Sequence, residues 1–168
     1  ETRAASAIFA ANRAQGAVRF DVRCDGGVTR RGRLHESGSL RVRFPSPEGD
    51  GLSAVFVNTA GGVAGGDHFD IAISAGEGTR LTLTTAAAEK VYRAPGPAAQ
   101  LDIALKAEAG SHLAWLPQET ILFDRARIAR RFDIDLAEDA SLLLCEIVVF
   151  GRAAMGETMR HGEFIDRW

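Results

Sequence analysis

The chain has 168 residues, of which 46% are hydrophobic and 25% are charged. A chain of this length and composition can bury a core of its own, which excludes wholesale disorder. Its formal net charge of −2 gives no general electrostatic attraction to nucleic acid or to an anionic membrane surface. No run of about 18 uninterrupted apolar residues is present, so the sequence predicts no membrane-spanning helix.

Alternation of apolar and polar residues dominates the chain, and a period of two is typical of half-buried strands. In chain order, the alternating segments are 18–24, 40–44, 69–73, 80–84, 101–105 and 132–136. The continuous apolar run 142–150 predicts a further strand that is buried on both faces. Helical patterns are short, at residues 6–13 and in the alanine-rich segment 85–91. We therefore predict an all-β fold with one or two short helices.

Three segments repeat one another, beginning at Phe69, Leu101 and Phe132, which are 32 and 31 residues apart. Each consists of a strand, a short turn and a second strand. A constant period of this size predicts stacked units, in which each unit covers the apolar face of its neighbour. The alternative is three evenly spaced hairpins. We expect residues 1–168 to form a single β-rich domain with a stacked, β-helix-like arrangement of strands.

A glycine-rich loop lies between two predicted strands, 54–57 and 69–74, and contains Gly61, Gly62, Gly65 and Gly66. Glycines permit positive φ angles and close backbone approach, which suits a tight crossover. The spacing fits neither a phosphate-binding loop nor a dinucleotide fingerprint. Asp67 and His68 follow the loop and offer oxygen and nitrogen ligands to a borderline metal such as nickel. The alternative is a purely structural turn, although we expect open space around the Asp67 carboxylate.

Three further carboxylates merit separate interpretation. Glu119 and Asp124 flank a short segment after Pro117, and such a pair can divide the roles of general acid and base, or can simply be solvated. Glu146 lies inside the apolar run, where an unpaired carboxylate is costly. It therefore needs a partner, and Arg93 and Arg152 are candidates.

Other chemistry has little support in the sequence. The two cysteines, Cys24 and Cys145, are far apart in apolar segments, which favours buried free thiols in a reducing cytoplasm. The four histidines lack the spacing of a preformed metal cage, so we expect no stable metal site. No serine lies in a nucleophile elbow.

Four segments appear in the order and spacing of the UreD (UreH) family of urease accessory proteins: 61–67, 83–93, 115–124 and 146–152. The segment 154–157 followed by Phe164 also resembles that family. The resemblance extends from about Asn12 to the last residue and lacks the family's C-terminal portion. We therefore expect this chain to be a piece of a longer UreD-type protein.

This resemblance implies a cytoplasmic, non-catalytic scaffold or metallochaperone that is needed for nickel insertion into apo-urease. The implied partners are UreF, UreG through UreF, and apo-urease, with no tightly bound cofactor and only transient Ni²⁺. The family is thought to pass nickel along an internal passage, which requires low-affinity oxygen ligands that release the ion. Carried over onto this sequence, the candidate passage residues are Asp67, Glu119, Asp124, Glu146, Thr84 and Thr85.

Two alternatives remain open. A β-solenoid enzyme that acts on carbohydrate would use Glu119 and Asp124 as its acid and base. Aromatic residues, which line sugar-binding clefts, make up only 7% of the chain and include a single tyrosine, which counts against this hypothesis. A binding module without any metal role is the other alternative.

Overall fold

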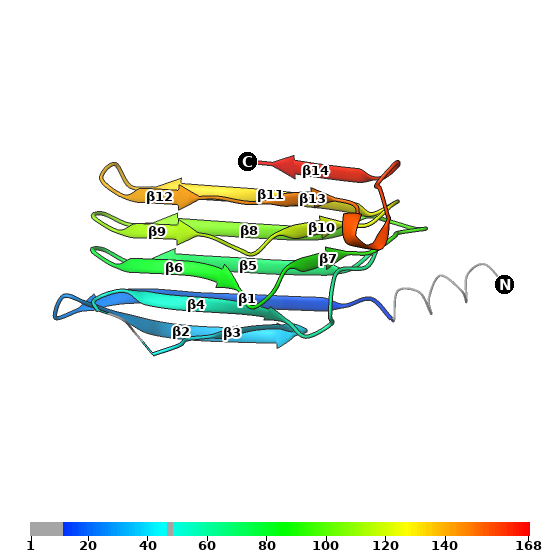
Figure 1. The fold of residues 1–168 in the computed structure, drawn as a ribbon. Helices are drawn as coiled ribbons and strands as arrows, with labels where there is room; N and C mark the ends of the chain where they lie inside the picture. The colour runs from blue at the N-terminus through cyan, green and yellow to red at the C-terminus, as the bar shows by residue number, and fades with distance from the viewer. Residues whose placement is uncertain (1–11, 47–48) are drawn as a thin grey trace.

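The computed structural model describes residues 12–46 and 49–168, and strands make up most of this part of the chain (Figure 1). The strands are β1 (Gln15–Asp25), β2 (Val28–Gly38), β3 (Leu40–Arg43), β4 (Leu52–Asn58), β5 (His68–Ala75), β6 (Arg80–Thr85), β7 (Glu89–Val91), β8 (Ala99–Ala107), β9 (His112–Trp115), β10 (Thr120–Leu122), β11 (Arg127–Leu136), β12 (Ser141–Leu144), β13 (Val148–Phe150) and β14 (Glu163–Arg167). The all-β prediction is confirmed.

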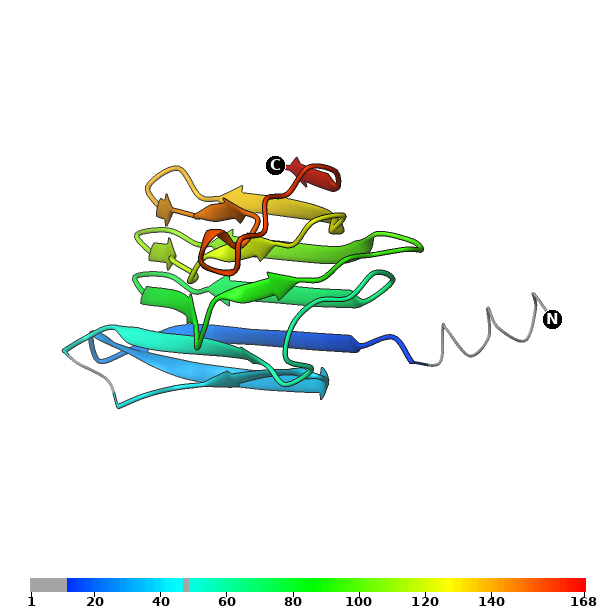
Figure 2. The same ribbon diagram turned by 45° about the vertical axis from the view of Figure 1, so that its right-hand side comes forward.

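From β5 onward the chain forms a stack of coils, each of which contributes one strand to each of three sheets (Figures 1 and 2). The coils are β5–β6–β7, β8–β9–β10 and β11–β12–β13, and β14 begins the next turn on the first sheet. Strands of successive coils pair in parallel. The three segments that repeat in the sequence therefore correspond to three stacked coils, and the β-helix-like arrangement is confirmed.

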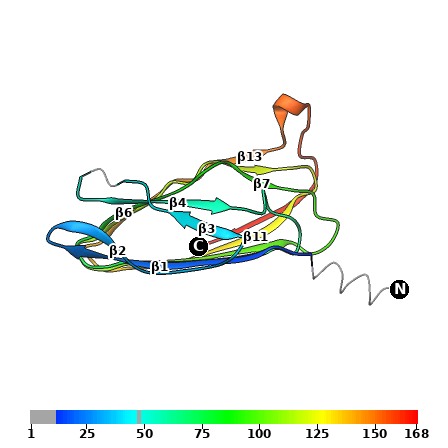
Figure 3. The same ribbon diagram turned by 90° about the horizontal axis from the view of Figure 1, so that it is seen from below.

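Two antiparallel hairpins close one end of the stack. β1 pairs with β2, and β3 pairs with β4; β1 also pairs in parallel with β5, and β4 with β6. The first sheet forms one wall, and the other two sheets form the opposite wall, as the view from below shows (Figure 3). Inward-facing side chains pack between the walls. An aromatic series runs through Phe20, Phe56, Trp115 and Phe132 to the exposed Trp168, with neighbouring ring centroids 5.2–6.5 Å apart.

The register of the third coil differs from the sequence repeat. The repeat aligns Leu101 with Phe132, whereas in the structure Leu101 pairs with Arg130, and Phe132 pairs with Ile103. A shift of two residues leaves the same side chains facing inward, so the hydrophobic pattern cannot detect it. The consequence is that Arg130 joins an inward-facing row with Phe69, Leu101 and Asp166.

Several local predictions are wrong. Residues 85–91 form a bend followed by β7 rather than a helix, because stacking against the neighbouring coils overrides the helical preference of alanine. The other predicted helix, 6–13, falls largely outside the described residues. Within the described residues the only helical segment is the 3-10 turn η1 (Ala153–Met155). It stands away from the two walls (Figure 3).

The apolar run 142–150 is also not one strand buried on both faces. It divides into β12 and β13, and Leu143 and Ile147 remain more than half exposed, because nothing in the described structure covers their side of the sheet. Cys24 and Cys145 are exposed rather than buried. In the described residues we find no helix with the length and hydrophobicity needed to cross a membrane.

An internal pocket as the candidate functional site

Each coil contains a corner at which the strand pairing of the second wall is interrupted. The corners lie between β6 and β7, between β9 and β10, and between β12 and β13. The second corner contains Pro117, which has no backbone N–H to donate. Thr85 ties the first two corners together, because its Oγ1 donates to the carbonyl of Ala87 at 3.0 Å and accepts from the Gln118 N–H at 2.9 Å.

An internal pocket of about 410 Å³ lies behind these corners, between the two walls. Most of its lining is apolar. The polar side chains on its walls are Asn58, Thr85, Glu89, Lys90, Gln118, Thr120, Arg130 and Glu146. A mostly apolar pocket with a few convergent polar groups is the usual setting of a binding site. We take this internal pocket as the candidate site.

Glu89 is the acidic group of the pocket on the coil β5–β6–β7. Burial raises the pKa of Glu89 above its ordinary value of 4.5; the side-chain amide of Asn58 and the backbone of Lys90 lower it in part, and the nearby Asp67 raises it further. The Asn58 Nδ2 donates to Glu89 Oε2 at 3.3 Å and to the carbonyl of Gly62 at 3.0 Å. No cation among the described residues forms an ion pair with Glu89.

Replacing Glu89 by Gln is expected to raise the melting temperature at pH 7. Because the pKa of Glu89 is higher in the folded state, the unchanged protein loses stability as the pH rises from the unfolded-state pKa through the folded-state pKa. The difference between Glu89→Gln and the unchanged protein should therefore close as the pH falls below about 4.5, where both states hold the proton. Thermal unfolding from pH 4 to 7.5 tests this, with Glu119→Gln as the control. Equal melting temperatures at pH 7 would contradict it.

Glu146 lies on the last corner and belongs to a buried ionic cluster. Its Oε1 accepts a hydrogen bond from Trp115 Nε1 at 2.8 Å, and its Oε2 forms an ion pair with Arg130. The Arg130 side chain is 5% exposed and that of Glu146 is 10% exposed. The predicted partners of Glu146, Arg93 and Arg152, are therefore wrong. The carboxylate pairs across the interior with the opposite wall, because the register places Arg130 in an inward-facing row.

Arg130 also binds Asp166 on β14 through two parallel bonds, Nε to Oδ1 at 3.1 Å and Nη2 to Oδ2 at 2.7 Å. Burial opposes ionisation of the Asp166 carboxyl, but hydrogen bonds from Arg130 and Trp168 outweigh it and hold the pKa of Asp166 below its usual value. The guanidinium lies over the rings of Phe132 and Phe164, 5.2 and 5.4 Å from their centroids. One buried cation thus holds two carboxylates at this end of the pocket.

Asp67 does not have the open surroundings that the glycine-rich loop predicts. It is 3% exposed, and both its oxygens accept backbone hydrogen bonds, Oδ1 from Ala14 at 2.8 Å and Oδ2 from Ala64 at 2.7 Å. The loop itself forms the expected crossover between β4 and β5. At Gly62, which has a φ of 144°, a Cβ atom would lie 2.5 Å from the Tyr92 ring. Asp67 therefore holds the loop that forms one wall of the pocket.

The remaining predicted residues are not brought together in the internal pocket. Thr84 and Glu119 are half-buried but do not line it, whereas Thr85 does. Asp124 caps a different loop: its Oδ1 accepts from the N–H groups of Arg160 and His161 at 2.8 and 3.2 Å, and these bonds lower the pKa of Asp124. Glu119 and Asp124 consequently share no pocket as an acid/base pair.

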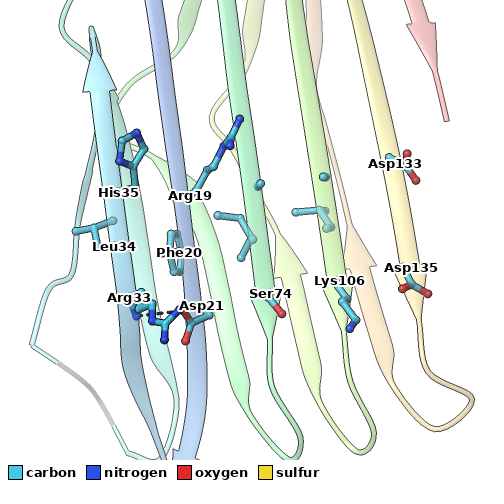
Figure 4. Close-up of a pocket in the computed structure, with 14 residues that line it drawn as sticks. Arg19, Phe20, Asp21, Arg33, Leu34, His35, Ser74, Lys106, Asp133 and Asp135 are labelled. Carbon is cyan, nitrogen blue, oxygen red and sulfur yellow. Dashed lines mark hydrogen bonds between the residues drawn. The ribbon is translucent and has the colours of Figure 1, made fainter.

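A larger hollow of about 840 Å³ lies on the outside of the first sheet (Figure 4). Most charged side chains around it already have partners. Arg19 pairs with Asp70, Lys106 with Glu108, and Asp133 with Arg131. Figure 4 shows the labelled side chains spread across separate strands. Because its charges do not converge, this outer hollow is a weaker candidate than the internal pocket.

Sequence reasoning missed Glu89 and Arg130. Glu89 lies in an alanine-rich segment that suggests a helix, and Arg130 lies two residues before the repeat unit that begins at Phe132. Aligning the corners of the three units would have placed Glu89 beside Thr120, with which it pairs in the structure. Among the described residues no group of three or more His, Cys, Asp or Glu side chains could hold a metal ion.

The family model and the individual relatives that match this chain all point to the same protein family. Residues 14–168 match the model of the family described as UreD urease accessory protein. Over 163 residues the chain is 79% identical to the urease accessory protein UreD of Bradyrhizobium diazoefficiens, and the match covers 97% of this chain and 59% of that relative. The corresponding protein of Rhodopseudomonas palustris strain BisB18 is 79% identical over 164 residues, with 98% and 59% covered. The chain thus spans about three fifths of the length of these relatives.

Proposed function

Because the chain belongs to the UreD urease accessory protein family, we propose that it forms part of a non-catalytic scaffold that delivers nickel to apo-urease. The observation that carries this proposal is the internal pocket, whose polar wall offers oxygen ligands on successive coils. Carboxylate, amide and hydroxyl oxygens bind nickel more weakly than a histidine and thiolate cage does, so the ion can leave again. Nickel is the cargo here rather than a resident cofactor.

Within the pocket, we propose Glu89, Thr85 and Glu146 as the residues that contact the passing ion. Glu89 carries most of this role, because no ion pair among the described residues neutralises it and a divalent cation would relieve the cost of its buried charge. Glu146 is already neutralised by Arg130, so it contributes after that pair rearranges. Asp67 supports the route by holding the glycine-rich loop. Thr84, Glu119 and Asp124 act outside the pocket.

The partners that this proposal requires are UreF, UreG through UreF, and apo-urease, in the cytoplasm and in the service of nitrogen metabolism. The proposal assigns no catalysis to the chain. A carbohydrate-active enzyme remains the weaker alternative, since Asp124 already caps a loop and shares no pocket with Glu119.

The test uses a chimera in which this chain replaces the matched span of the Bradyrhizobium diazoefficiens relative. Urease-producing cells that lack their own UreD receive the chimera or its Glu89→Gln, Glu146→Gln or Glu119→Gln variant. We expect Glu89→Gln to lower the nickel content and activity of urease by more than half, and the control Glu119→Gln to leave both unchanged. Retention of UreF in a pull-down shows that each variant is folded.

Two results would contradict the proposal. If the folded chimera fails to restore urease in these cells, the chain does not support maturation. If Glu89→Gln and Glu119→Gln give urease with equal nickel content, the pocket carboxylate has no part in delivery. Loss of UreF binding in Glu89→Gln would instead assign the residue to assembly.

A further inference from the structure

The outward face of the last complete coil carries an apolar stripe. From β12 to β13 the outward positions are Leu143, Cys145, Ile147 and Val149, which we call the outer stripe. Leu143, Ile147 and Val149 are 59%, 58% and 38% exposed. The inward positions of the same segment alternate with them and are half-buried. Both faces of this segment are therefore apolar, although only one face is covered by the described residues.

The first coil does not share this character, and the second coil shares it only in part. The register aligns Leu143 with Ala114 and, one coil further back, with Thr82. It aligns Val149 with Ile121 and then with Lys90. The same outward positions thus change from polar or charged to aliphatic along the stack. Scattered apolar residues on a surface are ordinary, but a contiguous exposed stripe that is complete on the last coil indicates a contact surface.

We propose that the outer stripe is an internal interface, covered by a segment of the same protein that lies outside the 163-residue span matched in the longer relatives. That span is 59% of the Bradyrhizobium diazoefficiens protein, so two fifths of such a chain are available to supply the cover. This inference is independent of nickel delivery.

The chemistry of the stripe favours a permanent intramolecular cover over a transient partner. Strands that are apolar on both faces are typical of sheets covered on both sides in the folded protein. A partner interface of standard size buries about 800 Å² on each side, whereas the stripe presents only a few side chains. From residue 143 to residue 149 it extends about 20 Å, at roughly 3.3 Å per residue. The covering segment must therefore present one apolar face of that length.

A cysteine in the outer stripe allows this inference to be tested by thiol labelling. Cys145 lies in the outer stripe, whereas Cys24 lies at the far end of β1, and both thiols are exposed in the described structure. We expect maleimide to label Cys145 at least about tenfold more slowly than Cys24 in the isolated chimera, because thiol reactivity depends on access. Mass spectrometry of the two peptides, with each single Cys→Ser variant, reads the sites separately.

A second measurement is needed because the labelling rates of Cys145 and Cys24 can also differ through the local environment of each thiol. Leu143→Lys in the chimera should lower the melting temperature by several degrees, whereas Thr82→Lys, on the same outward row two coils earlier, should not. Labelling of Cys145 as fast as Cys24, together with a tolerated Leu143→Lys, would overturn the inference. So would protection of Cys145 that arises only when UreF or apo-urease is added, which would assign the stripe to a partner.

Discussion

Replacing Arg130 by Met is expected to destabilise the protein by about 3–5 kcal/mol, because removing one member of a buried ion pair leaves an uncompensated charge. The Arg130 side chain is 5% exposed and pairs with the largely buried Glu146 and with the partly exposed Asp166. Its loss would leave the Glu146 carboxylate with only the Trp115 indole as a donor. Met fills a similar volume, so the loss reflects charge rather than a cavity.

Urea unfolding of the chimera would measure this loss. Arg131→Met is the matched control: Arg131 is the next residue, but it is 66% exposed and its pair with Asp133 lies at the surface, where such pairs contribute about 0–1 kcal/mol. Adding Glu146→Gln to Arg130→Met should recover much of the loss, since the amide oxygen can still accept from Trp115. Equal effects of Arg130→Met and Arg131→Met would show that the cluster is not buried in solution.

Replacing Asp67 by Ala is expected to destabilise the protein by about 2–5 kcal/mol, because two partly buried N–H groups lose their acceptor and each costs roughly 1–3 kcal/mol. These groups belong to Ala14 and Ala64, so the substitution removes the side chain that connects the residue before β1 to the glycine-rich loop. Nickel delivery should fall together with stability, and growth of the cells at low temperature should restore part of the nickel delivery.

Asp70→Ala provides the control for Asp67→Ala. Asp70 lies three residues further on and pairs with Arg19 at 3.3 Å, but the side chain is 39% exposed. Its replacement should therefore change stability by less than about 1 kcal/mol. Thermal unfolding of both variants, alongside urease nickel content, distinguishes the two roles of Asp67. Full stability of Asp67→Ala with complete loss of nickel delivery would make Asp67 a direct ligand and contradict the structural role.

Most of the strands could be predicted from the sequence, because alternation reports which side chains face a core. The parallel stacking could also be predicted, since units beginning at Phe69 and Leu101 have the same length and pattern. The register of the third coil could not. A shift of two residues leaves every side chain on the same face of the sheet. The sequence pattern therefore aligns Phe132 with Leu101, whereas in the structure Phe132 pairs with Ile103.

The candidate site was only partly predictable for the same reason. Glu146 was recognisable as a carboxylate in need of a partner, but its partner is set by the register of the opposite wall. Thr85 and Glu89 lie at a corner, where neither a period of two nor a helical period applies, so local pattern carries no information about them. Asp67 was recognisable as unusual, but whether a carboxylate beside glycines faces solvent or backbone N–H groups depends on which strand ends meet it.

The two ends of the stack differ in how far apart in sequence their paired strands lie. β1–β2 and β3–β4 are connected by short segments and can pair early, whereas every parallel pairing between coils must close a loop of about thirty residues. Each coil contacts only its immediate neighbours, so order spreads along the stack one coil at a time. We therefore expect the hairpin end to order first and, among the described coils, the coil that carries Glu146 to order later.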